Sequence, residues 1–434
     1  MIDIKGIKNG AVLQRDYEDF CSATLIANFK GTPKSSLGKL IKTGVNKWKL
    51  TGIYVGGPYT FTVKDDTDSI TFTDIYVGDL WLLAGQSNME GAGLMTPDDD
   101  YETASQKHFI RAFYMNDRWD AAKPILHNLY LSDDVSHKEA WNHNTESLRQ
   151  RGIDVFDNPP YEFRRHVGPG YYFAKEMFRL TYGIPQGVIA TAVGGAPIEM
   201  WLPVKEGENN YYTAACRRIE ETGSNIKGVF WAQGEGNPNF EIYPSQIESI
   251  RKDLCERTGK TVMPFVQMQS FKCTLCVDDA GANEVWSRFR ETQRKMPMNT
   301  EMLATVATND LELDDCIHLS SDSQKKAGVR GAGAMNYLLT GRGHAEPALD
   351  TVYVTKDRYV PSISSEIHIR YKNVSGNLKS SGVPFGFTIR KRDSGENFSV
   401  KMFKRIILDQ NEAVIRIEIP REQLYENNML VIPK

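Results

Sequence analysis

Alternating apolar and polar positions dominate the two ends of the chain. Residues 1–76 contain runs such as CSATLIANF and SITFTDIYV, which clusters of Gly, Pro, Asn and Asp separate. Residues 344–434 return to the same pattern in VYVTK, EIHIRYK and AVIRIEI. A period of two indicates strands with one buried face, so we predict an N-terminal and a C-terminal β domain, each sandwich-like. The pattern leaves open whether the two regions instead form one composite sandwich.

Between residues 77 and 343 the pattern changes to short apolar runs that alternate with helical periods. The apolar runs predict five strands, at 79–84, 187–193, 227–232, 262–268 and 302–307. Helices are predicted near 170–182, 211–222, 247–259, 283–295 and 321–339, the last with a capping box from Ser321 and Gln324. This alternation predicts an α/β domain with a five-stranded parallel sheet, whose strands all end at one edge.

One segment within this α/β domain follows neither period. Residues 95–165 are polar and rich in aromatic residues, and they are too many for a simple connecting loop. Long segments of this kind usually carry function, so we predict an insertion over the ligand-binding edge of the sheet.

Composition and charge narrow the choice of partners. The 434 residues are 41% apolar and 25% charged, which is typical of a globular protein, and the net charge of -3 makes nucleic acid and anionic membrane poor candidates. A single CTLC pair, Cys273 and Cys276, is a weak metal signal, and we predict no metal site. The first ten residues lack a signal-peptide core, which favours the cytoplasm if this N-terminus is native; a trimmed leader would mean a secreted or periplasmic protein. The oligomeric state stays open.

The stretch GDLWLLAGQSNM, residues 78–89, places a serine at the end of the first predicted strand. A permissive glycine, Gly85, precedes Ser87 in the turn where the chain leaves the sheet. A hydroxyl at this edge can meet a ligand, so Ser87 is a candidate nucleophile. The alternative is a Gly/Ser/Asn turn without chemistry.

Three further polar clusters follow predicted strand ends and would supply what a nucleophile needs. A backbone N–H of Gly194-Gly195, with that of Ser87, can stabilise an oxyanion, and the amide of Gln233 can do the same. Asp315 and His318 are three residues apart, so the carboxylate can hold one imidazole nitrogen and leave the other for a serine hydroxyl. Each cluster alone is more often an ordinary polar turn, but a nucleophile, oxyanion donors and an Asp/His pair at one predicted edge together favour a catalytic site.

These segments resemble the sialate O-acetylesterase and carbohydrate acetylesterase branch of the SGNH (GDSL-like) hydrolases. GQSNM is similar to the nucleophile block of that branch, FWAQGEGN to its WxQGExN block, and DDCIH to its terminal Asp-x-x-His. GGAPIEMW resembles its Gly-Gly block, although CIHLSS lacks the proline that often follows the histidine. The resemblance implies a flavodoxin-like SGNH hydrolase domain and a cofactor-independent serine esterase that removes O-acetyl groups from a carbohydrate.

The resemblance also implies residue roles. Ser87 would be the nucleophile, His318 the general base and Asp315 its orienting partner, with Ser87, Gly195 and Gln233 forming the oxyanion hole. The residues themselves, apart from the resemblance, suggest two roles for Glu235, which are to brace its loop through backbone N–H groups or to orient a histidine; the alternative is a polar strand-to-helix turn. Substrate-binding or structural roles are predicted for Gln86, Asn88, Glu235, Asn237, Trp201, His166, Arg165 and the neighbouring Arg164.

Other functions stay open at this point. The acetylated sugar can be sialic acid, xylan or another glycan, and a lipase-like or thioesterase SGNH enzyme is a further alternative. An alternative of a different class is a catalytically inactive protein whose β domains bind carbohydrate.

Overall fold

The computed structural model of the chain describes residues 2–95, 108–150, 152, 165–236, 238–271, 273, 280–379, 387–391, 394, 402–426 and 429–433. Two compact units divide the chain, Met1–Arg342 and Gly343–Lys434. Within the described residues, no helix is long and apolar enough to cross a membrane.

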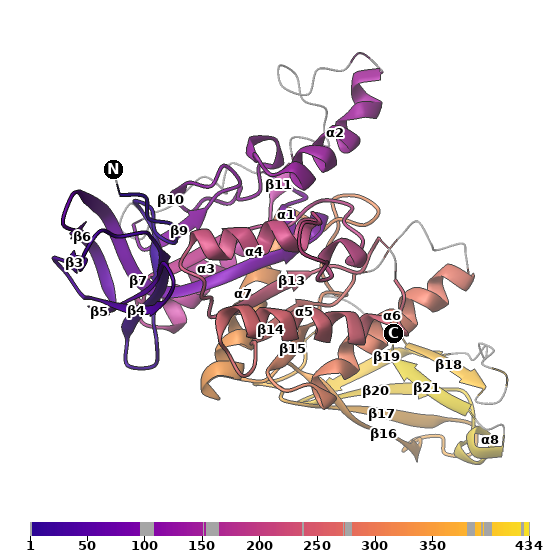
Figure 1. Cartoon of the computed structure of the whole chain (residues 1–434). Coiled ribbons are helices and arrows are strands. Elements are labelled where there is room, and N and C mark those ends of the chain that lie inside the picture. Colours follow the sequence, from indigo (N-terminus) through magenta and orange to yellow (C-terminus); the bar gives the residue numbers. More distant parts are fainter. Residues whose placement is uncertain are drawn as a thin grey trace. The chain divides into compact units, whose positions relative to one another are not determined.

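Strand β7 (Ser69–Gly85) organises the first unit (Figure 1). Its first half alternates between buried and exposed residues and pairs antiparallel with β6 (Gly56–Lys64), as in a sheet with one solvated face. From Ile75 to Gly85 every residue is buried, and the strand lies in the middle of a parallel sheet. The domain boundary predicted at residue 77 therefore falls inside one continuous strand, and the N-terminal strands share a compact unit with the central sheet.

Of the remaining N-terminal strands, β1 (Val12–Gln14) and β3 (Lys34–Ser35) extend the sheet of β6 and β7, and the other three form a sheet of their own. Strand β1 pairs parallel with Tyr76–Gly78. The other three are β2 (Phe20–Ile26), β4 (Lys39–Gly44) and β5 (Lys47–Tyr54), in the order β2-β5-β4.

The central sheet has six parallel strands in the order β9-β12-β7-β13-β14-β15, with β10 antiparallel beside β9. Five of them are the predicted strands: β7, β12 (Gln186–Ala190), β13 (Gly228–Ala232), β14 (Phe265–Met268) and β15 (Leu303–Val306). The prediction of five strands is wrong by one, because β9 (Ile110–Phe113) comes from the segment predicted as an insertion. Without β9 the order is 2-1-3-4-5, the flavodoxin-like order, and its switch point lies between β7 and β13.

Helices cover both faces of this sheet, with α4 and α5 in front of it in Figure 1 and α7 behind it. Alternate residues of β13 show the two layers. Phe230 stacks on Phe173 of α3, while Trp231 donates to the Tyr243 hydroxyl of α5. The major helices are α3 (Pro169–Leu180), α4 (Tyr211–Glu221), α5 (Tyr243–Thr258), α6 (Ala280–Asn299) and α7 (Ser321–Thr340).

The N-cap residue of α7 lies one residue before the predicted cap, so the helix begins at Ser321 itself. Ser320 is the N-cap residue, and its side chain accepts from the Ser323 N–H. The predicted capping box of Ser321 and Gln324 is therefore wrong. The Gln324 side chain instead donates to Asn88, next to the candidate nucleophile.

Alanine substitutions at two glycines of α7 are expected to change the stability of the protein in opposite directions. A Cβ at Gly331 would lie 2.5 Å from the Phe230 ring, whereas a Cβ at Gly333 would meet nothing within 4 Å. We expect Gly331→Ala to lower the free energy of unfolding by about 1–3 kcal/mol, because the ring or the helix must move. Gly333→Ala should raise it by about 0.5–1 kcal/mol through helix propensity. Urea denaturation of both variants checks this pair, and equal shifts would contradict the packing argument.

The elements between β7 and α3 are short, apart from α2. They are α1 (Ser87–Glu90), β8 (Gly93–Leu94), β10 (Trp119–Ala121), η2 (Leu129–Leu131), α2 (Val135–Gln150) and β11 (Arg165–Val167). The turn η4 (Ile198–Trp201) follows β12.

The second unit is described by itself. Strands β16 (Ala348–Lys356), β17 (Ser365–Lys372), β20 (Glu412–Ile417) and β19 (Met402–Asp409) form an antiparallel sheet in that order. Strands β18 (Phe387–Lys391) and β21 (Met429–Pro433) pair with each other, and α8 spans Arg421–Glu426. Its core contains Ile367, Ile369, Ile415, Ile417 and Leu424.

Candidate active site

Ser87 lies at the carboxyl end of β7, beside the switch point of the sheet. Gly85 has φ +129°, and a Cβ there would lie 2.0 Å from the Ala232 carbonyl oxygen. The Gln86 N–H donates to the same carbonyl at 2.7 Å, which fixes the turn against β13. Only glycine fits this position, and it places Ser87 at the first residue of α1.

His318 and Asp315 meet this serine although they are more than two hundred residues away in the chain. The His318 Nε2 lies 3.0 Å from Ser87 Oγ, and its Nδ1 lies 2.8 Å from Asp315 Oδ2. The other carboxylate oxygen of Asp315 accepts from the backbone N–H groups of Ile317 and His318, at 2.8 and 2.7 Å. Asp315 thereby fixes both the backbone turn and the orientation of the imidazole.

Asn88 connects the two halves of this arrangement. Its buried Oδ1 accepts from the Leu319 N–H at 3.0 Å and from Gln324 Nε2 at 3.2 Å, and its Nδ2 donates to the Ile317 carbonyl at 3.3 Å. Of the two roles predicted for Asn88, these contacts correspond to the structural one. The side chain next to Ser87 thus holds the loop that carries His318.

Gln86 joins the turn to the loop after β13. It is buried, and its Oε1 accepts from the backbone N–H groups of Gly234 and Gly236, at 3.5 and 3.4 Å. Both distances are at the upper limit for a hydrogen bond. Of the two roles predicted for Gln86, substrate binding or structure, these contacts correspond to the structural one.

The Gly-Gly turn after β12 lies beside the same edge. Val193 donates to the Gly85 carbonyl at 3.1 Å, which ties this turn to the end of β7. Gly195 has φ +71°, and a Cβ on it would meet nothing within 4 Å, so this side of the turn faces open space. The buried Gln233 side chain reaches the same turn, with Nε2 at 3.4 Å from the Ala196 carbonyl.

Glu235 is buried in the loop after β13, and burial raises its pKa to about 7. Its Oε2 has no hydrogen-bond partner among the described residues. His318 forms an ion pair with Asp315. In the part of the chain that the structure describes, no ion pair links His318 to Glu235. Of the two roles predicted for Glu235, these contacts do not support the orientation of the histidine.

The remaining residues predicted to bind substrate or to be structural are either buried in the core or outside the described residues. Trp201 is only 1% exposed and packs edge-on against Trp231, so it is a core residue rather than a surface for sugar. Asn237 and Arg164 lie outside the described residues, as do the side chains of Arg165 and His166 and the second cysteine of the CTLC pair, Cys276.

Two ionisable residues near the site were not predicted. Glu90, the last residue of α1, is partly buried, and burial raises its pKa to about 7. His127 is buried beside the backbone of Leu83 and Glu90, and burial lowers its pKa to about 3, so its ring is neutral. The spacing of Glu90, one helical turn after Ser87, was the available signal.

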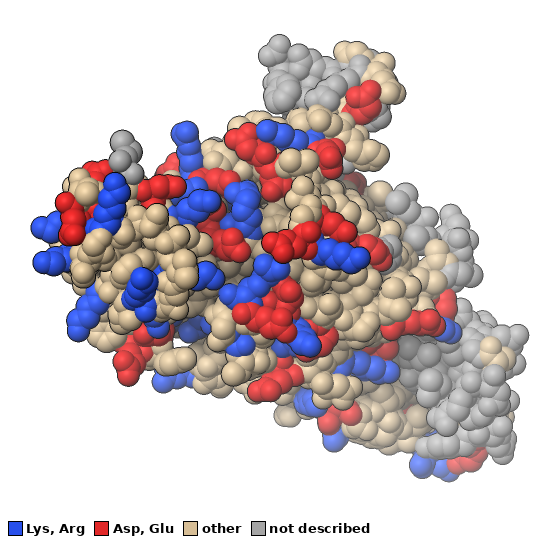
Figure 2. All heavy atoms as spheres, in the orientation of Figure 1, with Lys and Arg blue, Asp and Glu red and all other residues tan. Residues whose placement is uncertain are grey.

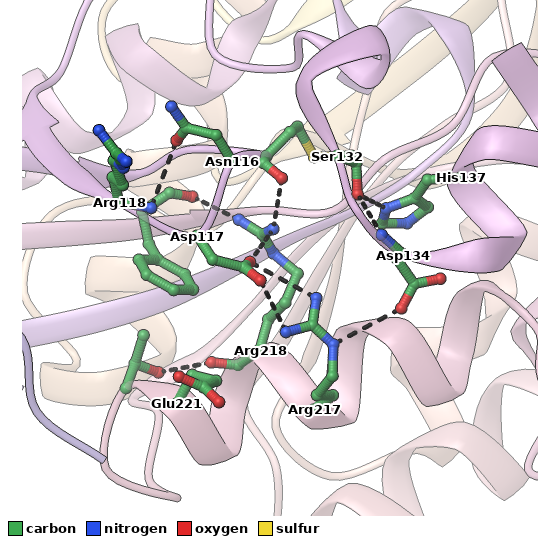
Figure 3. Close-up of polar contacts among 12 residues, drawn as sticks. Asn116, Asp117, Arg118, Ser132, Asp134, His137, Arg217, Arg218 and Glu221 are labelled. Carbon is green, nitrogen blue, oxygen red and sulfur yellow. Dashed lines mark hydrogen bonds and ion pairs between the residues drawn. The ribbon is translucent and has the colours of Figure 1, made fainter. Parts of the chain in front are cut away.

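A buried polar network holds the described part of the predicted insertion to α4 (Figure 3). Arg218 of α4 is fully buried and donates to Asp117 at 2.6 Å and to the Phe113 carbonyl at 2.9 Å. Arg217 pairs with Asp117 at 2.7 Å and with Asp134 at 3.5 Å. These charges are paired and hydrogen-bonded, so the network is a fixed scaffold for the start of α2.

Comparisons with known proteins agree with one another. A family model described as carbohydrate esterase, sialic acid-specific acetylesterase, matches residues 77–337, more than half of the chain. Sialate O-acetylesterases of Homo sapiens and Pongo abelii are each 26% identical over an alignment of 227 residues, and the match covers 45% of this chain and 40% of the relative. The chain thus matches less than half the length of these curated relatives.

A solved structure has a similar fold. The crystal structure of a carbohydrate acetylesterase from Xanthomonas citri is 20% identical, with a TM-score of 0.67, and the match covers 96% of this chain and 91% of that one. At this identity the likeness shows the fold.

Proposed function

This chain belongs to the carbohydrate esterase family of sialic acid-specific acetylesterases, and from that premise we propose that it is a serine esterase. Its reaction is the removal of O-acetyl groups from a carbohydrate. The observation that carries the proposal is the contact of His318 with both Ser87 and Asp315, at 3.0 and 2.8 Å. This is the hydrogen-bond connectivity by which a base activates a serine hydroxyl.

The first step forms an acetyl-enzyme. Ser87 Oγ attacks the acetyl carbonyl carbon while His318 Nε2 takes the hydroxyl proton. Asp315 accepts from Nδ1–H, which fixes the tautomer and stabilises the imidazolium. The tetrahedral intermediate then collapses: His318 returns the proton to the sugar oxygen, and the C–O bond to the sugar breaks.

The negative oxygen of the intermediate needs donors that are already in place. We assign this role to the backbone N–H of Ser87, the backbone N–H of Gly195 and the Nε2 of Gln233. Support comes from the open side of Gly195 and from the contact of Gln233 with the turn that follows it. Donors of this kind stabilise the charge without reorganisation during the reaction.

The second step releases acetate. Water replaces the sugar, and His318 takes a proton from it as the water oxygen attacks the acetyl carbonyl carbon of the ester on Ser87. The second tetrahedral intermediate then collapses: the bond between that carbon and Ser87 Oγ breaks, His318 returns the proton to Oγ, and acetate leaves. The nucleophile, the base and the donors all come from the protein chain, so we propose a reaction without a cofactor.

The sugar is the part of the proposal that the experiment must identify. We expect purified protein to release acetate from 9-O-acetylated sialic acid, following the family to which it belongs. Acetylated xylan and p-nitrophenyl acetate, assayed in parallel by enzymatic acetate detection, separate a sialate enzyme from an acetylxylan esterase and from a general esterase. A series of longer acyl esters tests the lipase-like alternative. Absence of acetate from every substrate would contradict the proposal and favour a binding protein.

A further inference from the structure

Glu90 presents a carboxyl group directly beside the turn to which we assign an oxyanion donor. It ends α1, and its backbone N–H donates to Gln86 at 2.9 Å, which fixes the residue one helical turn after Ser87. A Cβ on Gly194 would lie 2.5 Å from Glu90 Oε2, so this carboxyl oxygen occupies the side-chain space of Gly194. Gly195, the next residue, faces open space.

We propose that Glu90 controls the charge beside the oxyanion hole, and that its ionisation slows the acylation of Ser87. The inference rests on the proposed function in taking Ser87 as the nucleophile and the Gly195 turn as part of the oxyanion hole. In this inference Glu90 acts through its charge and not by contact with Ser87 or His318, so it is a positioning residue and not a catalytic one.

The surroundings of Glu90 offer little to neutralise a negative charge. Among the described residues, no lysine or arginine forms an ion pair with it. The neighbouring His127 is neutral, because burial holds its pKa near 3. The titratable residues on the segments around Glu90 are His127, Tyr171 of α3, Tyr211 of α4, Glu235 after β13, and the pair Asp315 and His318.

Burial raises the pKa of Glu90 to about 7, against the opposite effect of the nearby Gly194 N–H. Below that pH the carboxyl group is protonated and neutral, and above it the group is negative. The intermediate of acylation is negative too, and two like charges on neighbouring groups repel each other in a partly buried site. The acylation rate must therefore fall as the pH rises through this pKa, while ionisation of Glu90 leaves the nucleophile and base in place.

The test measures acylation-like labelling of Ser87 rather than hydrolysis of a particular sugar ester. An uncharged fluorophosphonate inactivates serine hydrolases by attack of the serine on phosphorus, with loss of fluoride. We expect its second-order rate constant on the wild type to pass through a maximum near pH 7 and to fall about tenfold by pH 9. Glu90→Gln should match the wild type within about twofold at pH 6 and show no fall at high pH.

Two control variants make the test specific, and a second variant with a direct titration covers a failure of Glu90→Gln to fold. Glu139→Gln, the same change at an exposed position of α2, should keep the wild-type profile. Glu235→Gln determines whether the other carboxyl group with a raised pKa causes the fall instead. If Glu90→Gln does not fold, Glu90→Met replaces it, and ¹³C NMR of glutamate-labelled wild type gives the titration directly, with a midpoint expected near 7.

The outcomes separate this inference from the proposed function. An alkaline fall that persists in Glu90→Gln, or a Glu90 that titrates at the ordinary value for glutamate, overturns the inference. Failure of the fluorophosphonate to label Ser87 overturns it as well. Labelling with the expected profile, together with no release of acetate from any sugar, would support the inference and contradict the proposed function.

Discussion

Replacing Ser87 with alanine is expected to lower kcat/KM for acetyl ester hydrolysis by a factor on the order of 10⁴ or more. The variant has no nucleophile, and the donors of the oxyanion hole can then assist only direct attack by water. The fold should be unaffected, because the main polar contact of the side chain is the one with His318. Initial rates of acetate release, measured on equal amounts of folded protein, give the ratio.

Ser245→Ala is the matched control for this prediction. Ser245 lies in α5 and is exposed, and its hydroxyl donates to the carbonyl of Ile242, the N-cap residue of that helix. Its removal should leave kcat/KM within about twofold, as expected for a surface change away from the site. Substantial activity in Ser87→Ala would mean that another group is the nucleophile, and the assignment of the site would be wrong.

Replacing His318 with alanine is expected to lower kcat/KM by about 10³–10⁵-fold, because the Ser87 hydroxyl then has no base. The ring is one-quarter exposed, so added imidazole can reach the space that it leaves. We expect imidazole to restore part of the activity in proportion to its neutral form, and not to restore any in Ser87→Ala. Rates across imidazole concentration and pH check both statements.

The second unit contains a histidine, His368, whose replacement is a stringent control for the His318→Ala prediction. His368 Nε2 lies 3.0 Å from Thr355 Oγ1, and its Nδ1 lies 3.2 Å from Glu412 Oε2, which repeats the hydroxyl–imidazole–carboxylate connectivity. Thr355, however, lies within β16, with no glycine turn or helix N-terminus after it to supply oxyanion donors. His368→Ala should therefore leave the rate unchanged. An unchanged rate would show that this connectivity alone does not make a catalytic site, whereas a large loss of activity would contradict the assignment of catalysis to Ser87 and His318.

The strands and helices of the central domain were predictable because their apolar runs are continuous. Each of the five predicted strands overlaps an observed one by most of its length. Strand β9 was missed because it is only four residues long and contains Arg111, which looks out of place in a buried strand. The guanidinium is buried because it donates to the Gly10 carbonyl and pairs with Asp74, two partners that lie far away in the sequence.

The sequence pattern also did not predict that β7 is one continuous strand. The domain boundary at residue 77 was predicted because the pattern changes there from alternating positions to short apolar runs separated by helical periods. In the folded protein a Cβ at Gly78 would lie 1.9 Å from the Pro185 carbonyl oxygen. The glycine is therefore needed for a close approach of the backbone within the strand, which only the partner segment explains.

The sequence by itself determined the two local parts of the candidate site. Gly85 to Asn88 specifies a tight strand-to-helix turn, and Asp315 to His318 specifies a turn in which a carboxylate holds an imidazole, because both depend on residues within three positions of one another. Only the tertiary structure decided that these turns meet, through the contacts of Asn88 with the histidine loop. It also decided the charge of Glu90, because the pKa of a carboxyl group depends on its burial, and burial is a property of the assembled fold.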